Sequence, residues 1–370
     1  MGCALSGLAA LSGVTSARGS LLFPDYVTQL AAQEHCLPDI QEPQPIRAGS
    51  DLEALLPQLA DASGLIVFSV FVDTKDHKES KRFELLLQQW MCRVRSHLGS
   101  SFLAFVDSEK LRQQFERPNQ TPAPTPVLVT PPGRHRNFGV AAYFSKEWIK
   151  EAFQGSGEGE KHDSNYWRWA AMESILRLGY SALYVDTDIM WLEDPRPGLA
   201  TLPSADFYGS CDSYDAGTGA IRWHQNGSLD MERMRKEAAK HDDESVCCQG
   251  MLVPVNAGIV LMRPSKAAWA AVMRFRARVI SGPCWGQAAM QWSLFELCGS
   301  SLQCEVLDPL RFASAGPLLM ELRRTQQASY QPSLIHLDLG AKRKANKFFE
   351  GFFDIPKECS EPPTETRSDL

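Results

Sequence analysis

The sequence lacks several features that define common protein classes. No run of 18 or more apolar residues occurs, so no transmembrane span is predicted. Basic residues are not in excess: the net charge is -6 and the pI about 5.8, which disfavours nucleic acid as a partner. The ten cysteines show no zinc-finger spacing and are too sparse for a disulfide scaffold. What remains is a globular chain of 370 residues, 44% of them hydrophobic, which is enough for one large core or two modest ones.

The N-terminus lacks the positively charged start of a secretory signal peptide. Its first six residues instead fit the N-myristoylation pattern, with Gly2 as the acceptor and Cys3 available for a second acyl chain. Two N-glycosylation sequons, at Asn119 and Asn226, favour a secretory lumen. Two locations therefore stay open: the Golgi or another endomembrane lumen and, alternatively, the cytoplasm with acylation at Gly2. Membrane association would require that lipid or an anchor encoded upstream.

A strand, a helix and a second strand are predicted near the start of the folded region. Residues 64–73 are a continuous apolar run of strand length that ends at Asp73. Residues 102–107 form a second such run, which ends at Asp107. Between them, apolar residues recur at helical spacing over 83–98. In such a βαβ unit ligands gather beyond the carboxyl ends of the strands, so both aspartates are predicted to lie there, with a capping or loop role as the alternative.

The rest of the chain alternates between the same kinds of element. Further strands and helices are predicted from the apolar pattern at residues 140–153, 166–178, 206–211, 252–262, 266–279, 287–298, 303–307 and 334–337. The charged segment 212–248 is predicted to be an insertion or a mobile loop near the site. The predicted fold class is α/β, with residues 61–355 as one domain, 1–60 as a partly disordered lead-in and 356–370 as a disordered tail.

Residues 182–191 carry the strongest chemical signal. A short apolar run there ends in Asp186 and Asp188, and apolar residues resume at once. Residues two apart point the same way on an extended chain, so the two carboxylates can face one cation together if the local backbone stays strand-like. Without a neutralising partner the pair would repel and be costly to desolvate. Hard oxygen ligands at this density suit Mg²⁺ or Mn²⁺, which makes a diphosphate substrate the first interpretation and an ordinary strand exit the alternative.

Three stretches line up with one family. Over residues 168–195, a helix ends in Leu-Gly-Tyr before a strand, the D-x-D motif, a tryptophan and a proline. Later come the segment Asn-Ala-Gly at 256–258, followed by Arg263, and then Gln287 on a predicted helix. In this order they resemble the nucleotide-diphospho-sugar transferases of glycosyltransferase family 77, in which an Asp-Gln pair is usual where Gln287 stands. The resemblance covers about residues 64–351.

This resemblance implies a Rossmann-like GT-A nucleotide-sugar transferase fold, a single mixed sheet flanked by helices. The implied metal ligands, for Mn²⁺ or Mg²⁺, are Asp186, Asp188 and His336. The implied donor-binding residues are Val72, Asp73, Asp107, Arg168, Asp186, Asn256, Gly258 and Lys342. Gln287 and Asn256 are the candidates for a catalytic role, although no catalytic residue is identified.

Two departures from the family pattern bear on activity. Gly286 stands where the aspartate of the Asp-Gln pair is expected, so a carboxylate role is absent at that position. His336, Gly340 and Lys342 resemble the C-terminal histidine-glycine-lysine element of related retaining transferases, but their spacing differs slightly from its commonest form. The alternatives are a structural core histidine and a solvated lysine.

The sequence therefore predicts a metal-dependent glycosyltransferase, a hexosyl- or pentosyltransferase. It would move a sugar from a nucleotide-diphosphate donor, UDP-linked in the first interpretation, to a glycan or glycoprotein hydroxyl. Retention of configuration is implied by the resemblance alone. The alternatives are an inactive relative that serves as a binding or scaffold protein, which Gly286 favours, and a nucleotidyltransferase that makes sugar nucleotides. The latter would need a glycine-rich basic loop after the first strand, and residues 74–78 are not one.

Overall fold

The computed structural model describes the chain in segments, which are residues 45–46, 49–71, 90–99, 101–115, 140–152, 164–187, 189–211, 214–215, 220–221, 255–281, 286–298, 301–308, 311–314 and 332–336. Four of the predicted site residues lie outside these segments: Val72, Asp73, Asp188 and Lys342. Both sequons, Gly2 and most of the charged segment 212–248 also lie outside them.

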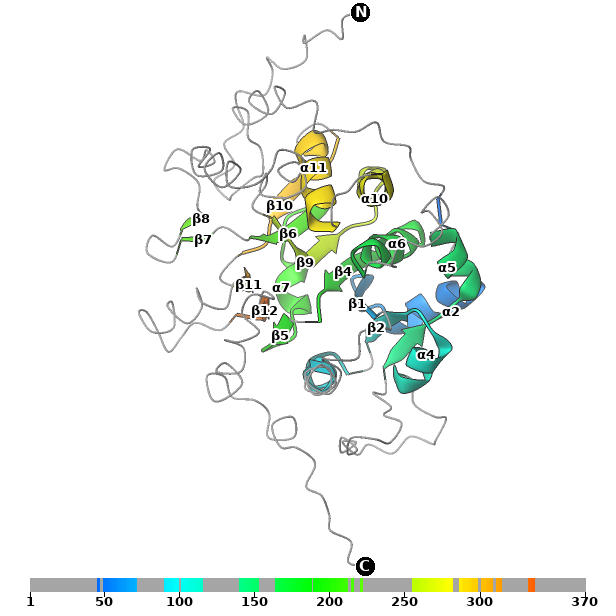
Figure 1. Cartoon of the computed structure of the whole chain (residues 1–370). Helices are drawn as coiled ribbons and strands as arrows, with labels where there is room; N and C mark the ends of the chain where they lie inside the picture. The colour runs from blue at the N-terminus through cyan, green and yellow to red at the C-terminus, as the bar shows by residue number, and fades with distance from the viewer. Residues whose placement is uncertain are drawn as a thin grey trace, which may run out of the picture.

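A single ten-stranded sheet runs through the described segments (Figure 1). Its strand order is β3-β2-β1-β4-β9-β6-β11-β12-β5, with β10 beside β6. The strands are β1 (Leu65–Phe71), β2 (Phe102–Val106), β3 (Ala141–Tyr143), β4 (Ser181–Val185), β5 (Ile189–Trp191), β6 (Phe207–Cys211), β9 (Val255–Met262), β10 (Cys304–Val306), β11 (Phe312–Ser314) and β12 (Leu334–His336).

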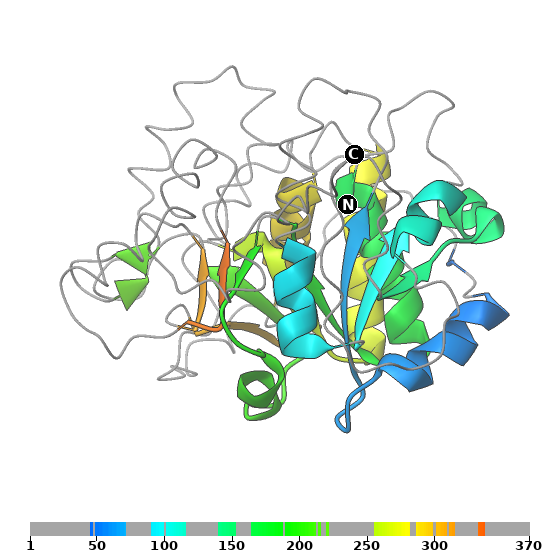
Figure 2. The same cartoon turned by 90° about the horizontal axis from the view of Figure 1, so that it is seen from below.

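The sheet is mixed. Strands β1 to β4 are parallel to one another, and Figure 2 shows β1 in blue beside β2 in cyan. Strand β9 is antiparallel to both of its neighbours, β4 and β6. A separate two-stranded sheet pairs β7 (Tyr214–Asp215) with β8 (Ala220–Ile221). The predicted α/β class with one central mixed sheet is therefore confirmed.

Helices cover both faces of this sheet (Figure 1). One face carries α2 (Ser50–Leu59), α5 (Lys146–Ala152), α6 (Ser164–Arg177), α10 (Lys266–Ser281) and α11 (Gly286–Leu297). The other face carries the helix of residues 90–98, α4 (Glu109–Phe115) and α7 (Arg196–Ala200). Strand β1 is buried on both faces, as predicted, because Phe68 packs in the first core and Val67 in the second. No described helix combines the length with the hydropathy of a membrane span.

Helix α6 packs against the sheet and against α10, and a buried ion pair joins the two helices. Gly179 follows its end with a φ of 86°, a left-handed conformation that glycine adopts without strain, as predicted. Glu173 pairs with Arg276 of α10, and neither side chain is exposed. Burial raises the pKa of Glu173, while the charge of Arg276 acts in the opposite direction. Glu173 also accepts a hydrogen bond from the backbone N–H of Ile46 at 2.8 Å, which attaches the segment before α2.

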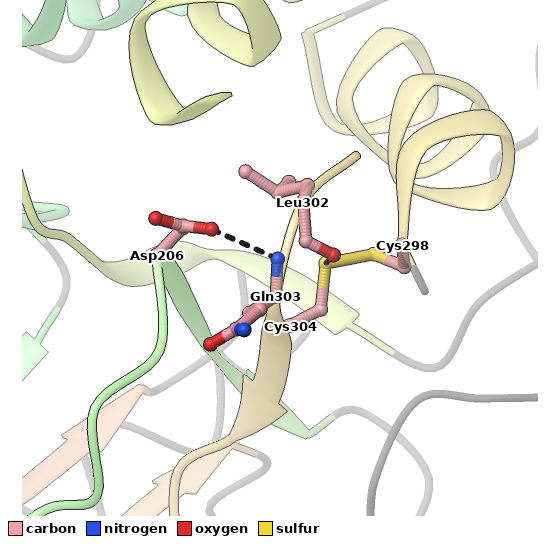
Figure 3. The surroundings of a disulfide bond; sticks show 5 residues. All are labelled: Asp206, Cys298, Leu302, Gln303 and Cys304. Atoms are coloured by element: carbon pink, nitrogen blue, oxygen red, sulfur yellow. Dashed lines mark hydrogen bonds between the residues drawn. A yellow bond between two sulfur atoms is a disulfide. The ribbon is translucent and has the colours of Figure 1, made fainter. Parts of the chain in front are cut away.

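A disulfide joins Cys298, just after α11, to Cys304, the first residue of β10 (Figure 3). Beside it, a carboxylate oxygen of Asp206 accepts a hydrogen bond from the backbone N–H of Gln303 at 2.9 Å. The turn between α11 and β10 is therefore held at two points. Cys92 is also disulfide-bonded. The sequence alone does not determine how the cysteines pair.

Residues 182–191 contribute two separate strands of the sheet, β4 and β5. Strand β4 ends at Val185, and β5 begins at Ile189 at the edge of the sheet. Between them the backbone N–H of Ile189 donates to the carbonyl of Asp186 at 3.2 Å, which is the hydrogen bond of a tight turn. Asp186 therefore lies where the chain leaves β4, and Asp188 lies outside the described residues.

Helix α2 lies within the segment predicted as a lead-in. Its residues Leu52, Leu56 and Leu59 recur at helical spacing and are buried in the same core as α6. Helices α4 and α7 and strand β11 were not predicted from the apolar pattern, and all three are short. The domain boundaries themselves remain a prediction.

Candidate active site

Asp186 lies at the carboxyl end of β4, next to the centre of β9. Its backbone N–H donates to the carbonyl of Gly258 at 2.8 Å, which continues the antiparallel pairing of β4 with β9 by one residue. Its side chain is 25% exposed. The backbone of this aspartate is thus fixed by the sheet, while its carboxylate is open to a ligand.

Strand β9 has an irregular stretch beside Asp186. Its register with β6 shifts between Gly209 and Ser210, so residues 257–259 lie opposite no residue of β6. Such a bulge leaves backbone groups without their ladder partners and redirects the strand locally. These groups need other hydrogen-bond partners, because unpaired buried backbone groups are costly.

Side chains supply those partners, and two of them are the predicted catalytic candidates. Oδ1 of Asn256 accepts the backbone N–H of Gly258 at 2.5 Å. Oε1 of Gln287, from the first turn of α11, accepts the backbone N–H of Ala257 at 3.2 Å. Both amide oxygens therefore hold the bulge in this structure, which is a positioning role for β9.

His336 comes close to Asp186 because β5 follows the D-x-D motif in the chain and pairs with β12. In that pairing Ile189 lies opposite His336. The Nε2 atom of His336 lies 3.9 Å from Oδ2 of Asp186, and the histidine side chain is 9% exposed. A Cβ atom on Gly258 would lie 2.8 Å from that Nε2, so only glycine leaves room for the imidazole in this position.

These two side chains are close enough together to approach one metal ion. Two ligands with bonds of about 2.1 Å lie from about 3 Å apart, at right angles, to about 4.2 Å apart, on opposite sides. The 3.9 Å between His336 and Asp186 falls in this range. Within the described residues no group of three or more His, Cys, Asp or Glu side chains is arranged for a metal. Asp188, the third predicted ligand, lies outside them.

Arg168 extends from α6 toward the carboxylate of Asp186. Its Nη1 donates to the carbonyl of Ala257 at 2.9 Å and lies 3.7 Å from Oδ2 of Asp186. Its guanidinium stands 4.8 Å from the ring centre of Tyr184, and the Tyr184 hydroxyl donates to Oδ1 of Asp186. The predicted donor-binding residue Arg168 is thus brought to the carboxylate, where its positive charge offsets the negative one.

Asp107 follows β2, at the same end of the parallel strands as Asp186. Its backbone N–H donates to the carbonyl of Phe71 at 3.3 Å, which extends the pairing of β2 with β1. Strand β1 separates it from β4, and the described contacts around Asp186 do not include it. The structure thus brings together Arg168, Asp186, Asn256, Gly258, Gln287 and His336, but not Asp107.

Two further residues support this group and were not predicted from the sequence. Tyr184 precedes Asp186 by two positions in the apolar run, a spacing that puts both side chains on one face of a strand. Gln291 follows Gln287 by one helical turn, is 1% exposed, and donates from Nε2 to the carbonyl of Val255 at 2.7 Å. A polar residue two positions before Asp186 on the strand, and another one helical turn after Gln287, could have indicated both residues from the sequence.

A family model covers the segments that carry this group of residues. The model of the nucleotide-diphospho-sugar transferase family matches residues 135–349, which is more than half of the chain. The match includes all of these residues from Arg168 to His336. It identifies the wider family, and assignment to family 77 stays a prediction. No curated protein matches the chain.

Two solved structures have similar folds at low sequence identity. The bifunctional glycosyltransferase WbbM is 12% identical, with 80% of this chain and 51% of WbbM covered and a TM-score of 0.43, so this chain spans about half of that protein. The galactosyltransferase LgtC, in complex with donor and acceptor sugar analogues, is 16% identical, with 80% of this chain and 98% of LgtC covered and a TM-score of 0.39. Neither TM-score supports an argument about substrate. On the family match, this chain belongs to the nucleotide-diphospho-sugar transferases and is a glycosyltransferase.

Proposed function

We propose that this glycosyltransferase is metal-dependent and moves a sugar from a UDP-linked donor to a hydroxyl of a glycan or glycoprotein. The cofactor is Mn²⁺ or Mg²⁺. The observation that carries this proposal is the 3.9 Å approach of His336 Nε2 to Asp186 Oδ2 at the end of β4. Retention of configuration is also proposed, on the resemblance to family 77.

In this proposal Asp186, Asp188 and His336 hold the cation against the donor diphosphate. When bound, it offsets the negative charge that develops on the departing diphosphate. Asn256 and Gly258 let the donor approach the backbone of β9 closely. The remaining donor contacts are assigned to Val72, Asp73, Asp107, Arg168 and Lys342.

A donor screen with Mn²⁺, read as release of free nucleotide, tests the proposal directly. We expect UDP-sugars to be used, and Asp186→Asn and Asp188→Ala to lower turnover by about 100-fold or more. Asp194→Asn is the matched control, because Asp194 pairs with Arg196 away from the site and should leave turnover unchanged. If folded Asp188→Ala protein retained full Mn²⁺-dependent transfer, metal dependence through this motif would be ruled out. A wild-type protein that bound UDP equally with and without Mn²⁺ would instead support a binding role.

We also propose that the protein acts in the lumen of the Golgi or another endomembrane compartment. The Cys298–Cys304 disulfide supports this, since disulfides persist in oxidising compartments. The test is a mobility shift on treatment with an endoglycosidase, with Asn119→Gln and Asn226→Gln as controls that should remove it. The alternative, a cytoplasmic acylated protein, predicts no shift and incorporation of myristate that Gly2→Ala abolishes.

A further inference from the structure

Tyr184 contacts one oxygen of the Asp186 carboxylate. It precedes Asp186 by two residues on β4, its side chain is 3% exposed, and its hydroxyl donates a hydrogen bond to Oδ1. A hydrogen bond to an ionised acceptor is among the stronger ones in proteins. The hydroxyl therefore occupies one of the two lone-pair sites of Oδ1 and competes with a cation for it.

The ring of Tyr184 has little freedom to withdraw. The guanidinium of Arg168 lies 4.8 Å from its centre on one side, and the ring of Phe68 packs at 5.5 Å between centres. Arg168 is itself held by its bond to the carbonyl of Ala257. The packing of the ring by Arg168 and Phe68 therefore holds the hydroxyl next to Asp186.

The other oxygen of Asp186 faces the space shared with His336. Oδ2 lies 3.9 Å from Nε2 of His336 and 3.7 Å from Nη1 of Arg168, and within the described residues it accepts no hydrogen bond. Asp186 thus offers one oxygen to a cation and keeps the second bonded within the protein. A carboxylate held in this way is a one-oxygen ligand.

We propose that Tyr184 is a positioning residue that sets metal selectivity, by restricting Asp186 to one-oxygen coordination. Ca²⁺ takes six to eight oxygen ligands and often binds both oxygens of a carboxylate, whereas Mg²⁺ needs compact octahedral coordination and Mn²⁺ shares its preference for oxygen ligands. The restriction therefore favours Mn²⁺ and Mg²⁺ over Ca²⁺. This inference rests on the proposed metal-dependent function.

The test measures metal binding rather than activity. Titration calorimetry in the presence of UDP gives the dissociation constants of Mn²⁺ and Ca²⁺ for the wild-type full chain and for Tyr184→Phe. We expect the ratio of Ca²⁺ to Mn²⁺ dissociation constants to fall by about fivefold to tenfold in Tyr184→Phe, because both oxygens of Asp186 become available.

Tyr208→Phe is the matched control. Tyr208 is also a buried strand tyrosine, its hydroxyl donates to the carbonyl of Pro203, and the guanidinium of Arg263 lies 5.4 Å from its ring centre. Its substitution should leave the metal ratio unchanged. Melting curves of both variants establish that they are folded.

The outcomes separate this inference from the proposed function. If the wild type binds Mn²⁺ with UDP but Tyr184→Phe keeps the wild-type ratio, the role of Tyr184 is wrong and metal dependence stands. If the wild type binds no Mn²⁺, or if Asp186→Asn binds it as tightly as the wild type, the proposed site and this inference both fail.

Discussion

The absence of a side chain at Gly258 determines how closely His336 approaches Asp186. A Cβ at this position would lie 2.8 Å from two atoms of the imidazole and from Oδ1 of Asn256. The backbone of Gly258 also accepts the N–H of Asp186. Glycine at position 258 is thus required both for the position of the histidine and for the local backbone hydrogen bonds of β9.

Gly258→Ala is expected to leave a folded protein that binds Mn²⁺ with UDP about tenfold or more weakly, because the imidazole must move. The overpacking should also lower stability by about 1–3 kcal/mol. Calorimetric titration and urea unfolding measure the two effects. In a His336→Ala background the stability loss should be smaller, since part of the clash is removed. An equal loss in both backgrounds would show that the imidazole is not the group that resists the methyl.

At the scale of elements, α11 holds the bulge of β9 through two glutamines one turn apart. Gln287 bonds the N–H of Ala257, and Gln291 bonds the carbonyl of Val255. This arrangement gives Gln287 a positioning role that does not require its amide group to take part in chemistry.

The variants Gln287→Glu and Gln287→Leu test that role. A glutamate keeps an oxygen for the N–H of Ala257, so Gln287→Glu should retain most of the wild-type kcat. Gln287→Leu should lower kcat by about tenfold and stability by about 1–3 kcal/mol, because a backbone donor is left unsatisfied. Gln291→Leu, which acts farther from Gly258, should lower stability by a similar amount with less effect on kcat. Loss of activity in Gln287→Glu equal to that in Gln287→Leu would favour a direct catalytic role.

Helices α6 and α10 are joined by the buried pair of Glu173 and Arg276. Arg276 also donates to the hydroxyl of Tyr166 at 3.0 Å and to the carbonyl of Ala152 at 3.3 Å. The pair thus connects three helices, and Glu173 adds the segment at Ile46. Such a group is fully hydrogen-bonded only while every partner is present.

Arg276→Met is expected to destabilise the protein by about 3–5 kcal/mol, because it leaves the Glu173 carboxylate buried without its partner. The double variant Glu173→Gln, Arg276→Met should be more stable than Arg276→Met alone, since no buried charge remains. Urea unfolding of the single and double variants provides the comparison. If the double variant were the less stable of the two, the cost would come from lost packing rather than from the unpaired charge.

At the scale of the whole molecule, the Cys298–Cys304 disulfide ties the helix that holds the bulge to β10, and β10 pairs with β6. A disulfide across so short a loop lowers the entropy of the unfolded chain only modestly. It is expected to raise the free energy of unfolding by about 2 kcal/mol. Replacing both cysteines by serine should therefore lower stability by about this amount under oxidising conditions. Urea unfolding with and without reductant measures this loss of stability. If reductant still destabilises the double variant, that effect comes from other disulfides, such as that of Cys92. Unchanged stability in the double variant would contradict the prediction.

Several elements of the fold could be predicted from local patterns in the sequence. The buried strand β1, the helix α6 with its end at Gly179, and the D-x-D motif after β4 were all predicted, because burial periodicity and glycine chemistry are local properties. The short elements α4, α7 and β11 were not predicted, because a few residues carry too little periodicity.

The sequence by itself determined the α/β class and the place of Asp186 at the end of a strand. Only the tertiary structure decided what surrounds that carboxylate. His336 arrives there through the pairing of β12 with β5, and Arg168 through the packing of α6 on the sheet. The physical reason is that local patterns record which residues are buried, whereas the order and register of strands decide which distant residues meet.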